Sequence, residues 1–524
     1  MSALQPLFLD LGPLGDLVTP RGPLEQWQDH GLGLLRTILW RAGIATSVAS
    51  TRACRVWAEL DRPFRRANRL MMNVRSYNFR LAAEAARRFH RVQPEGLVLV
   101  GGLHATVDPA SMRADAAFDR ICAGPGEGII ADLVREPGQF PRFFLGQGAR
   151  TMAEWPAIER TLWPKPRGWR ARRRFPWPLE PACGWGPAPV ATILTSRTCP
   201  WSCAFCNEAS YLPHTGRRPA ESVLAELNDL DQRHGPIGSV VLHDSLFFQQ
   251  PSWLNQWREC YPRLARRIWP YWAAARSDLI RRWPELFKQL VRETRWDVIS
   301  LGLESGSDRM LRLLNKEHGA ADNLFAIDLI NRLGDELEAE HRPAPRVWAN
   351  IMLGIPGETR QDAFQTMSMV RRIKRGLLSP SFFTAYPGSV LGYQLIAEGK
   401  SLLSAEEYQR YPREEKIAGV DYGFYRGLLA GRYNSEIEQV KWPDAPAPTA
   451  RAPTCFFLFA TRDPRGVLAY GGDPKDALEI LSLRLTPEEM GAVQKDRWRA
   501  VSRDELVRIG LRGLGAGLLQ PTPR

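Results

Sequence analysis

Three cysteines within eight residues form the pattern in this 524-residue chain that is best suited to chemistry. Three residues separate Cys199 from Cys203, and two separate Cys203 from Cys206. One loop with this spacing can bring three thiolates to a single four-iron cluster and leave one iron without a cysteine ligand. A structural zinc ion would need a fourth ligand, which His214 could supply only at an awkward spacing. The spacing therefore favours an iron–sulfur cluster with an open position for a substrate or cofactor.

The rest of the composition is that of an ordinary globular protein. Hydrophobic residues make up 44% of the chain and charged residues 24%, which excludes a disordered, collagenous or coiled-coil protein. No apolar run approaches the roughly 18–20 residues that a membrane span needs, and residues 1–20 lack the features of a signal peptide. The other cysteines are too scattered for a disulfide framework, namely Cys54, Cys122, Cys183, Cys260 and Cys455. We therefore expect a cytoplasmic protein without a membrane span.

The chain is basic, with a formal net charge of +13. Part of this charge lies in residues 141–188, which also hold five tryptophans and many prolines. Basic side chains interleaved with aromatic rings can bind single-stranded nucleic acid. The plainer interpretation is an inter-domain connector that packs its rings against a neighbouring domain, and we favour it. Nucleic acid is therefore an unlikely partner, and the positive charge mainly favours solubility.

Residues 1–140 alternate short apolar strands with amphipathic helices. Buried strands that run into glycine turns, with helices between them, predict a doubly wound, Rossmann-like parallel sheet. The expected strands are residues 7–11, 45–49, 69–74, 96–100 and 120–123, and the expected helices are residues 31–42 and 80–92.

Residues 189–400 repeat the strand–helix alternation six times. This series predicts a partial (β/α)6 barrel, in which the chemistry lies at the carboxyl ends of the strands. The expected strands are residues 190–195, 237–243, 271–275, 298–303, 346–353 and 381–385. Residues 401–524 form a C-terminal accessory region. It contains a linker rich in proline and alanine at 442–453, followed by helix-capping boxes at 486–489 and 502–505, which predict a small, mostly helical module.

The cysteine spacing at the end of the first barrel strand resembles the radical SAM superfamily. The resemblance extends over residues 190–400, because further family-like segments follow the later strands in order. An aromatic residue, Phe205, precedes the last cysteine. The strand-end segments are residues 243–245, Arg276, residues 302–307, residues 354–359 and residues 386–389.

The resemblance implies roles for these residues. The three thiolates would hold a [4Fe–4S] cluster whose free iron binds S-adenosylmethionine, and one electron would cleave this cofactor to a 5′-deoxyadenosyl radical. By the same resemblance, the candidate SAM-binding residues are Phe205, Asp244, Arg276, Glu304, Ser305, Gly354, Ile355 and Pro356. Asp244 and Arg276 would face the methionine moiety, and Glu304 and Ser305 the ribose. The alternatives are a structural ion pair for Asp244 and Arg276, and plain turns for the glycines.

The N-terminal region resembles the cobalamin-binding domain that is fused to many radical SAM enzymes. The resemblance rests on residues 96–106 and on the glycine-rich turn at 124–128. It implies cobalamin contacts from Gly101, Gly102, His104, Thr106, Gly124 and Glu127. Domains that ligate cobalt through histidine carry Asp-x-His-x-x-Gly, whereas residues 29–33 have the aspartate one place off. We therefore expect no histidine beneath the cobalt, and His30 and His104 to be capping or packed residues.

The resemblance as a whole implies a cobalamin-dependent radical SAM enzyme, and we favour a methyltransferase that acts on an unactivated carbon. The cofactors would be a [4Fe–4S] cluster, S-adenosylmethionine and cobalamin, with an electron donor such as flavodoxin or ferredoxin. The alternative is a radical SAM enzyme that catalyses cyclisation, rearrangement or oxidation with a vestigial cobalamin domain. A non-catalytic iron–sulfur or nucleic-acid-binding protein would leave the ordered strand-end segments unexplained. The sequence identifies neither a catalytic residue nor the substrate, which could be a small molecule or a peptide.

Overall fold

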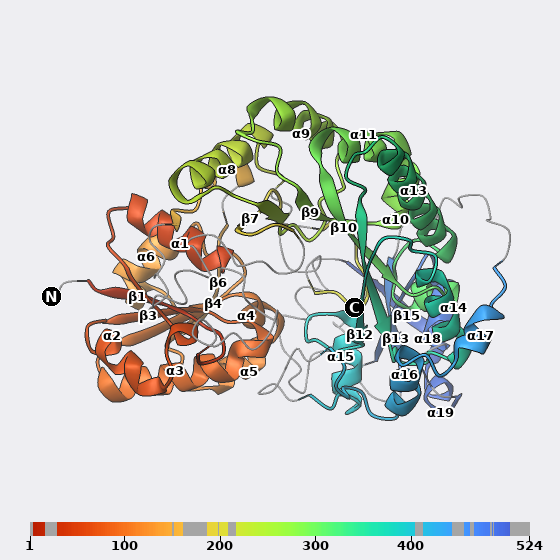
Figure 1. The fold of residues 1–524 in the computed structure, drawn as a ribbon. Helices are drawn as coiled ribbons and strands as arrows, with labels where there is room; N and C mark the ends of the chain where they lie inside the picture. The colour runs from red at the N-terminus through yellow and green to blue at the C-terminus, as the bar shows by residue number, and fades with distance from the viewer. Residues whose placement is uncertain are drawn as a thin grey trace.

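The computed structural model of the chain describes most of its length. The described residues are 4–15, 29–148, 151–160, 186–197, 199–207, 216–403, 412–442, 455–461, 466–482, 485 and 487–502. Within them, an N-terminal α/β domain lies beside a larger α/β domain, and a small C-terminal sheet packs against the latter (Figure 1). None of the described helices is long and apolar enough to span a membrane.

The N-terminal domain is a doubly wound parallel sheet, as the sequence predicts. In the described residues its strand order is β2-β1-β3-β4-β5-β6, and successive side chains of a strand enter two different cores. On β3, Leu70 and Met72 face one core, whereas Met71 faces the other. The strands are β1 Pro6–Asp10, β2 Ser47–Ser50, β3 Arg69–Asn73, β4 Leu97–Gly101, β5 Arg120–Ala123 and β6 Phe143–Leu145.

Helices cover both faces of this sheet (Figure 1). The first core contains residues of α2 and α3, and the second contains residues of α1 and α6. The helices are α1 His30–Arg41, α2 Asp61–Arg65, α3 Phe79–Val92, α4 Leu103–Val107, α5 Pro109–Ala114 and α6 Ile130–Arg135. Short 3-10 turns are η1 Thr51–Ala53, η2 Trp57–Leu60, η3 Ser76–Asn78, η4 Pro137–Gln139 and, in the connector, η5 Met152–Glu154.

The second domain is the predicted partial barrel. In the described residues its parallel strands follow one another in the order β12-β11-β10-β9-β8-β7, so the sheet is open between β7 and β12. The strands are β7 Val190–Ile193, β8 Ser239–Leu242, β9 Tyr271–Ala275, β10 Trp296–Glu304, β11 Arg346–Leu353 and β12 Gly376–Phe382. The helices are α8 Ala220–His234, α9 Pro251–Leu264, α10 Ser277–Arg282, α11 Pro284–Thr294, α12 Asp308–Leu313, α13 Ala320–Ala339, α14 Arg360–Val370 and α15 Val390–Ala397.

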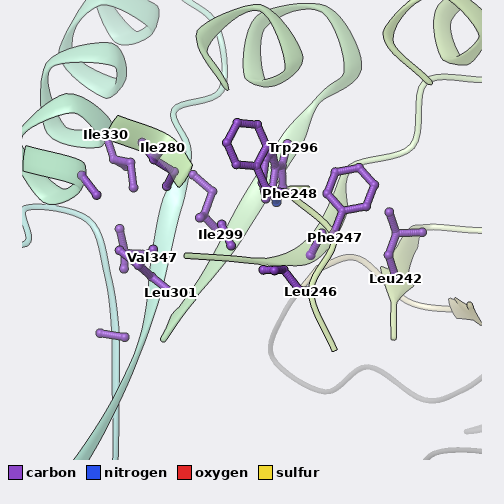
Figure 2. Packing of buried hydrophobic residues seen from close by; sticks show 14 of the residues in the cluster. Leu242, Leu246, Phe247, Phe248, Ile280, Trp296, Ile299, Leu301, Ile330 and Val347 are labelled. Carbon is purple, nitrogen blue, oxygen red and sulfur yellow. The ribbon is translucent and has the colours of Figure 1, made fainter. Parts of the chain in front are cut away.

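The side chains on the outer face of the barrel strands pack against these helices. Figure 2 shows this layer, in which Trp296, Ile299 and Leu301 of β10 lie among residues of neighbouring elements. Alternation along β10 leaves Ser300, Gly302 and Glu304 outside this outer cluster. The strand therefore directs Glu304, its last residue, toward the inside of the barrel mouth.

The sixth barrel strand differs from the expected residues 381–385. β12 pairs with β11 in a continuous register from Val347 opposite Gly376 to Leu353 opposite Phe382. Its first residues are solvent-exposed, with Leu377 54% exposed. Because an edge strand with exposed residues lacks the buried apolar pattern, its start was hidden from the sequence analysis.

The C-terminal region contains helices, as expected, together with an antiparallel sheet that was not expected. In the described residues the sheet order is β14-β13-β15. Phe456 and Leu458 of β13 share a core with Ala204 of the cysteine loop, whereas Phe457 and Phe459 pack toward α18. The elements are α16 Tyr422–Leu429, α17 Asn434–Glu438, β13 Cys455–Ala460, β14 Val467–Gly471, α18 Pro474–Ser482, α19 Pro487–Gly491 and β15 Gln494–Val501. Residues 443–453 of the expected linker and 503–505 of the second capping box lie outside the described residues.

Candidate functional site

The cysteine loop follows β7 directly and is anchored to the barrel by backbone contacts. The amide of Ala204 donates to the Leu314 carbonyl at 2.8 Å, and the Ala204 carbonyl accepts from Leu391 at 2.9 Å. The Asn315 side chain donates to the Ser202 carbonyl at 2.8 Å. None of the three cysteines of this loop forms a disulfide, and each is half-buried, namely Cys199, Cys203 and Cys206. The fold thus holds the backbone of the loop that carries all three thiols.

A buried guanidinium lies against this loop. The Arg276 Nη1 atom is 3.6 Å from the Cys203 Sγ atom, and the guanidinium stacks over the Trp201 ring at 4.6 Å. Its other donors contact the Asp278 carboxylate and the Lys316 carbonyl. Burial lowers the pKa of Arg276, but Asp278 and the cysteines Cys203 and Cys199 outweigh this effect and raise it. A permanent positive charge therefore lies beside a cysteine that must be a thiolate to bind metal.

The donor set fits an iron–sulfur cluster by its chemistry. Within the described part of the chain, no group of three His, Cys, Asp or Glu side chains is already arranged to hold a metal ion. The fit therefore rests on three cysteines without disulfides on one short anchored loop and on the guanidinium beside Cys203. His214, the candidate fourth ligand of a zinc site, lies outside the described residues.

Asp244 lies beneath the start of the cysteine loop, where protein groups hydrogen-bond to its carboxylate. Its Oδ1 atom accepts from the amides of Thr195 at 2.7 Å and Ser196 at 3.0 Å. Its Oδ2 atom accepts from the Thr195 hydroxyl and lies 3.8 Å from Arg217. Both oxygens thus organise the protein itself. The geometry supports the structural alternative for this residue more than a contact with methionine.

Glu304 forms a buried ion pair that the sequence analysis did not anticipate. Its Oε1 atom is 3.5 Å from the Lys316 Nζ atom, which also lies 5.9 Å from the centre of the Phe205 ring. Lysine is almost never buried unless it is paired, and Lys316 is 4% exposed. Left-handed backbone conformations occur at Glu304, Asn315 and Glu317, and strained backbone of this kind clusters at functional sites.

The remaining expected SAM-binding residues lie in the turn after β10, in the turn after β11 and on the cysteine loop. Ser305 is fully buried, and its hydroxyl bonds to the Thr366 hydroxyl and to the Ser307 amide at 3.1 Å each, so it stabilises the turn after β10. Phe205 and Ile355 belong to one apolar cluster and could form a wall for an adenine ring. Gly354 has φ +69°, and its amide donates to Glu358 at 2.7 Å. Pro356 follows in the same turn and is half-buried.

In the N-terminal domain, one hydroxyl connects the two glycine-rich loops. The Thr106 Oγ1 atom accepts from the Gly124 amide at 2.8 Å and donates to the Gly102 carbonyl at 3.1 Å. Gly102, which follows Gly101 at the end of β4, has φ +101°, and a Cβ atom there would lie 2.0 Å from the Asn73 side chain. Only glycine fits this position. The loops after β4 and β5 are therefore held together as one unit.

The histidines near these loops hydrogen-bond to hydroxyl groups of the protein. His104 is fully buried, and its ring nitrogens bond to the hydroxyls of Ser76 at 3.1 Å and Ser111 at 3.0 Å. Burial lowers the pKa of His104 to about 4. The His30 Nε2 atom contacts the Thr192 hydroxyl of the barrel at 3.1 Å. These positions agree with packed histidines rather than with ligands to cobalt.

Glu127, one of the residues expected to contact cobalamin, has a buried carboxylate oxygen that forms no hydrogen bond with the described residues. It is 8% exposed, and its Oε1 atom is paired with Arg197, just before the cysteine loop. Its Oε2 atom is buried and has no hydrogen-bond partner among the described residues. A buried acceptor without a partner calls for an explanation such as an absent ligand. The amide groups around a corrin ring would supply suitable donors, so this loop fits cobalamin.

Comparisons with known proteins agree with this arrangement. Residues 193–370 match the family model of the Radical SAM superfamily. The anaerobic magnesium-protoporphyrin IX monomethyl ester cyclase of Rubrivivax gelatinosus is 23% identical over 339 residues, which cover 60% of this chain and 56% of that protein. An uncharacterised methyltransferase of Pyrococcus horikoshii is 24% identical over 328 residues, which cover 60% of this chain and 66% of that protein. The match thus spans little more than half the length of the cyclase.

Two solved structures share the fold across both domains. The radical S-adenosylmethionine methyltransferase TsrM from Kitasatospora setae, with cobalamin and a [4Fe-4S] cluster bound, superposes with a TM-score of 0.54 and 17% identity, covering 80% of this chain and 83% of that one. The cobalamin-dependent S-adenosylmethionine radical enzyme OxsB, with aqua-cobalamin and S-adenosylmethionine bound, gives a TM-score of 0.54 and 13% identity, covering 83% and 62%. Residues 193–370 therefore match the Radical SAM superfamily, and they lie within a fold that this protein shares with TsrM and OxsB.

Proposed function

We propose that this protein is a cobalamin-dependent radical SAM methyltransferase that acts on an unactivated carbon. The observation that carries the proposal is the contact between Glu127 of the glycine-rich loop and Arg197 at the start of the cysteine loop. It brings the loop expected to hold cobalamin next to the loop expected to hold the cluster. TsrM, which shares the fold, is itself a methyltransferase with both cofactors bound.

The chain's own residues would divide the work as follows. Cys199, Cys203 and Cys206 would hold the cluster, and Arg276 would keep a positive charge beside it. Glu304 would accept hydrogen bonds from ribose hydroxyls, while Phe205 would contribute an apolar wall. When bound, these cofactors supply a carbon-centred radical and a transferable methyl group. A one-electron donor such as flavodoxin or ferredoxin would be the natural partner.

A second candidate is a radical cyclase or oxidase that uses the same domains. It is favoured by the similarity to a magnesium-protoporphyrin IX monomethyl ester cyclase. The two candidates differ in how they would use S-adenosylmethionine. A methyltransferase that re-methylates its cobalamin would form S-adenosylhomocysteine in addition to 5′-deoxyadenosine, whereas a cyclase would form 5′-deoxyadenosine alone.

A substitution in the glycine-rich loop tests the proposal. Gly126 has space around its Cβ position, because the nearest atom, in Leu35, lies 3.9 Å away. Gly126→Trp should fill the expected cobalamin space without disturbing the loop, and should abolish both cobalamin binding and S-adenosylhomocysteine formation. Formation of 5′-deoxyadenosine should persist, because the barrel keeps its own SAM site. The assay is product analysis under anaerobic, reducing conditions with cobalamin supplied.

The matched control is Gly138→Trp, in η4 at the opposite end of the same domain. A Cβ atom at Gly138 also meets no atom within 4 Å, so this variant should bind cobalamin like the wild type. If the wild-type protein binds cobalamin and forms 5′-deoxyadenosine but never S-adenosylhomocysteine, even with its true substrate, the methyltransferase proposal fails and the cyclase candidate leads.

A further inference from the structure

Three segments from different parts of the chain meet at Arg197. Its guanidinium pairs with Glu127 of the loop after β5 and lies 5.1 Å from the centre of the Trp155 ring in the connector. Arg197 itself follows β7 and stands two residues before Cys199. We refer to Glu127, Trp155 and Arg197 as the clamp.

The clamp is more than a surface ion pair. The Glu127 side chain is 4% exposed and that of Arg197 is 29% exposed. Exposed pairs contribute little because water screens them, whereas removing one partner of a buried pair leaves an unpaired charge in the protein. The Trp155 ring beside the guanidinium adds a cation–π contact. Among the described residues, Arg197 is the only hydrogen-bond partner of Glu127.

Both ends of the clamp are attached to rigid structure. Next to Glu127, the amide of Gly128 donates to the Gln147 carbonyl at 2.7 Å, which fixes the loop beside β6. Next to Arg197, the Ser196 amide donates to the buried Asp244 at 3.0 Å, and Ser196 forms a β-bridge with Arg217. A shift of the cysteine loop must therefore displace either the ion pair or the glycine-rich loop.

We propose that the clamp is a positioning device that couples the cysteine loop to the glycine-rich loop of the N-terminal domain. Ordering the cysteine loop then orders residues 124–128, 70 residues earlier in the chain. This inference rests on the proposed function in assigning a cluster to one loop and cobalamin to the other. Glu127 and Arg197 are positioning residues in this scheme.

Other contacts hold the two domains together when the clamp is lost. They include the His30–Thr192 bond at 3.1 Å and the bond from the Tyr393 hydroxyl to the Val107 carbonyl. Clamp variants should therefore remain folded and lose only the local coupling.

The test is hydrogen–deuterium exchange of full-length protein before and after anaerobic reconstitution with iron and sulfide. In the wild type, cluster assembly should slow exchange at residues 124–128 at least severalfold. In Arg197→Met and Glu127→Gln this protection should disappear, although both variants should still take up iron. The charge-reversed double variant, Glu127→Arg with Arg197→Glu, should recover it. Such rescue would not occur if each residue merely supported its own loop.

The control is Arg312→Met, which removes a different contact between modules, the 2.9 Å pair between Arg312 of α12 and Asp476 of α18. It should leave the protection at residues 124–128 intact. Equal protection in the wild type and Arg197→Met would overturn the clamp.

A second readout is the ratio of cobalamin dissociation constants in the apo and reconstituted proteins, which should fall to one in Arg197→Met because coupling between sites is reciprocal. If no cobalamin binds, the proposed function fails, while the exchange experiment still tests the clamp.

Discussion

Glu304 and Lys316 form a charged pair in a position where burial makes charge costly. Lys316 is 4% exposed and Glu304 is 9% exposed, and both adjoin left-handed backbone. Such an arrangement persists only where the surrounding structure enforces it. Glu304 ends β10 at the barrel mouth, where the proposed function places the ribose of S-adenosylmethionine.

Replacing Glu304 with glutamine tests this placement. The proposed function has the Glu304 carboxylate accept hydrogen bonds from ribose hydroxyls, and hydrogen bonds to charged groups contribute about 1.5–3 kcal/mol. Glu304→Gln keeps an acceptor oxygen but removes the charge, so it should weaken S-adenosylmethionine binding roughly five- to tenfold while leaving the iron content unchanged. Equilibrium binding to reconstituted protein measures this effect. The matched control is Glu338→Gln on the exposed surface of α13, and an unaltered affinity in Glu304→Gln would remove Glu304 from the site.

At the scale of elements, α4 is tied to its neighbours by one imidazole. His104 joins Ser76 of η3 to Ser111 of α5. Burial lowers the pKa of His104 to about 4, whereas an unfolded histidine titrates near about 6.5. Between these two pKa values the unfolded chain binds a proton at His104 that the folded domain does not. The contribution of His104 to the free energy of unfolding is therefore fully present above about pH 6.5 and is lost progressively as the pH falls toward about 4.

The prediction concerns the slope of stability against pH. One proton corresponds to about 1.4 kcal/mol per pH unit between the two pKa values. His104→Gln should lower stability at pH 7, because it disturbs two buried hydrogen bonds, but should flatten the slope of the N-terminal domain by about one proton between pH 6 and 4.5. Urea unfolding at several pH values measures this slope, with the unfolding of α4 detected by mass spectrometry of its peptides. Parallel curves for the two proteins would show that His104 is not the group responsible.

The elements also show which parts of the fold were readable from the sequence. The bounds of β5, β9 and β11 match the expected ranges, because a buried apolar run between turn residues leaves little choice of end. The sheet of β13, β14 and β15 was missed, although β13 is a continuous apolar run. The helix-capping patterns at 486–489 and 502–505, which both follow β13 and β14, drew the interpretation toward helix. β15 offers no pattern of its own because most of its residues are exposed.

The candidate site was readable only in part, for a related reason. The cysteine spacing and the glycine-rich turns are local, so the sequence displays them directly. Pairs such as Lys316 with Glu304 and Arg197 with Glu127 form only when distant segments meet in the folded chain. Lys316 stands in a turn after a short helix, where no spacing distinguishes it from a solvent-exposed lysine. Asp244 was named correctly as a strand-end residue, but its partners lie on the neighbouring loop.

At the scale of the whole molecule, the cysteine loop is supported from three sides. The barrel anchors its backbone, the C-terminal sheet shares a core with Ala204, and Glu127 of the N-terminal domain pairs with Arg197 just before it. The proposed function therefore depends above all on what the three thiols of this loop bind.

The most direct test of the central claim is the metal and cobalamin content of anaerobically purified and reconstituted protein. The account predicts about four irons per chain, together with bound cobalamin. Cys203→Ala should lose the iron, whereas Cys455→Ala, which removes an exposed cysteine outside the loop, should retain it. Stoichiometric zinc without iron in the wild-type protein would contradict the account.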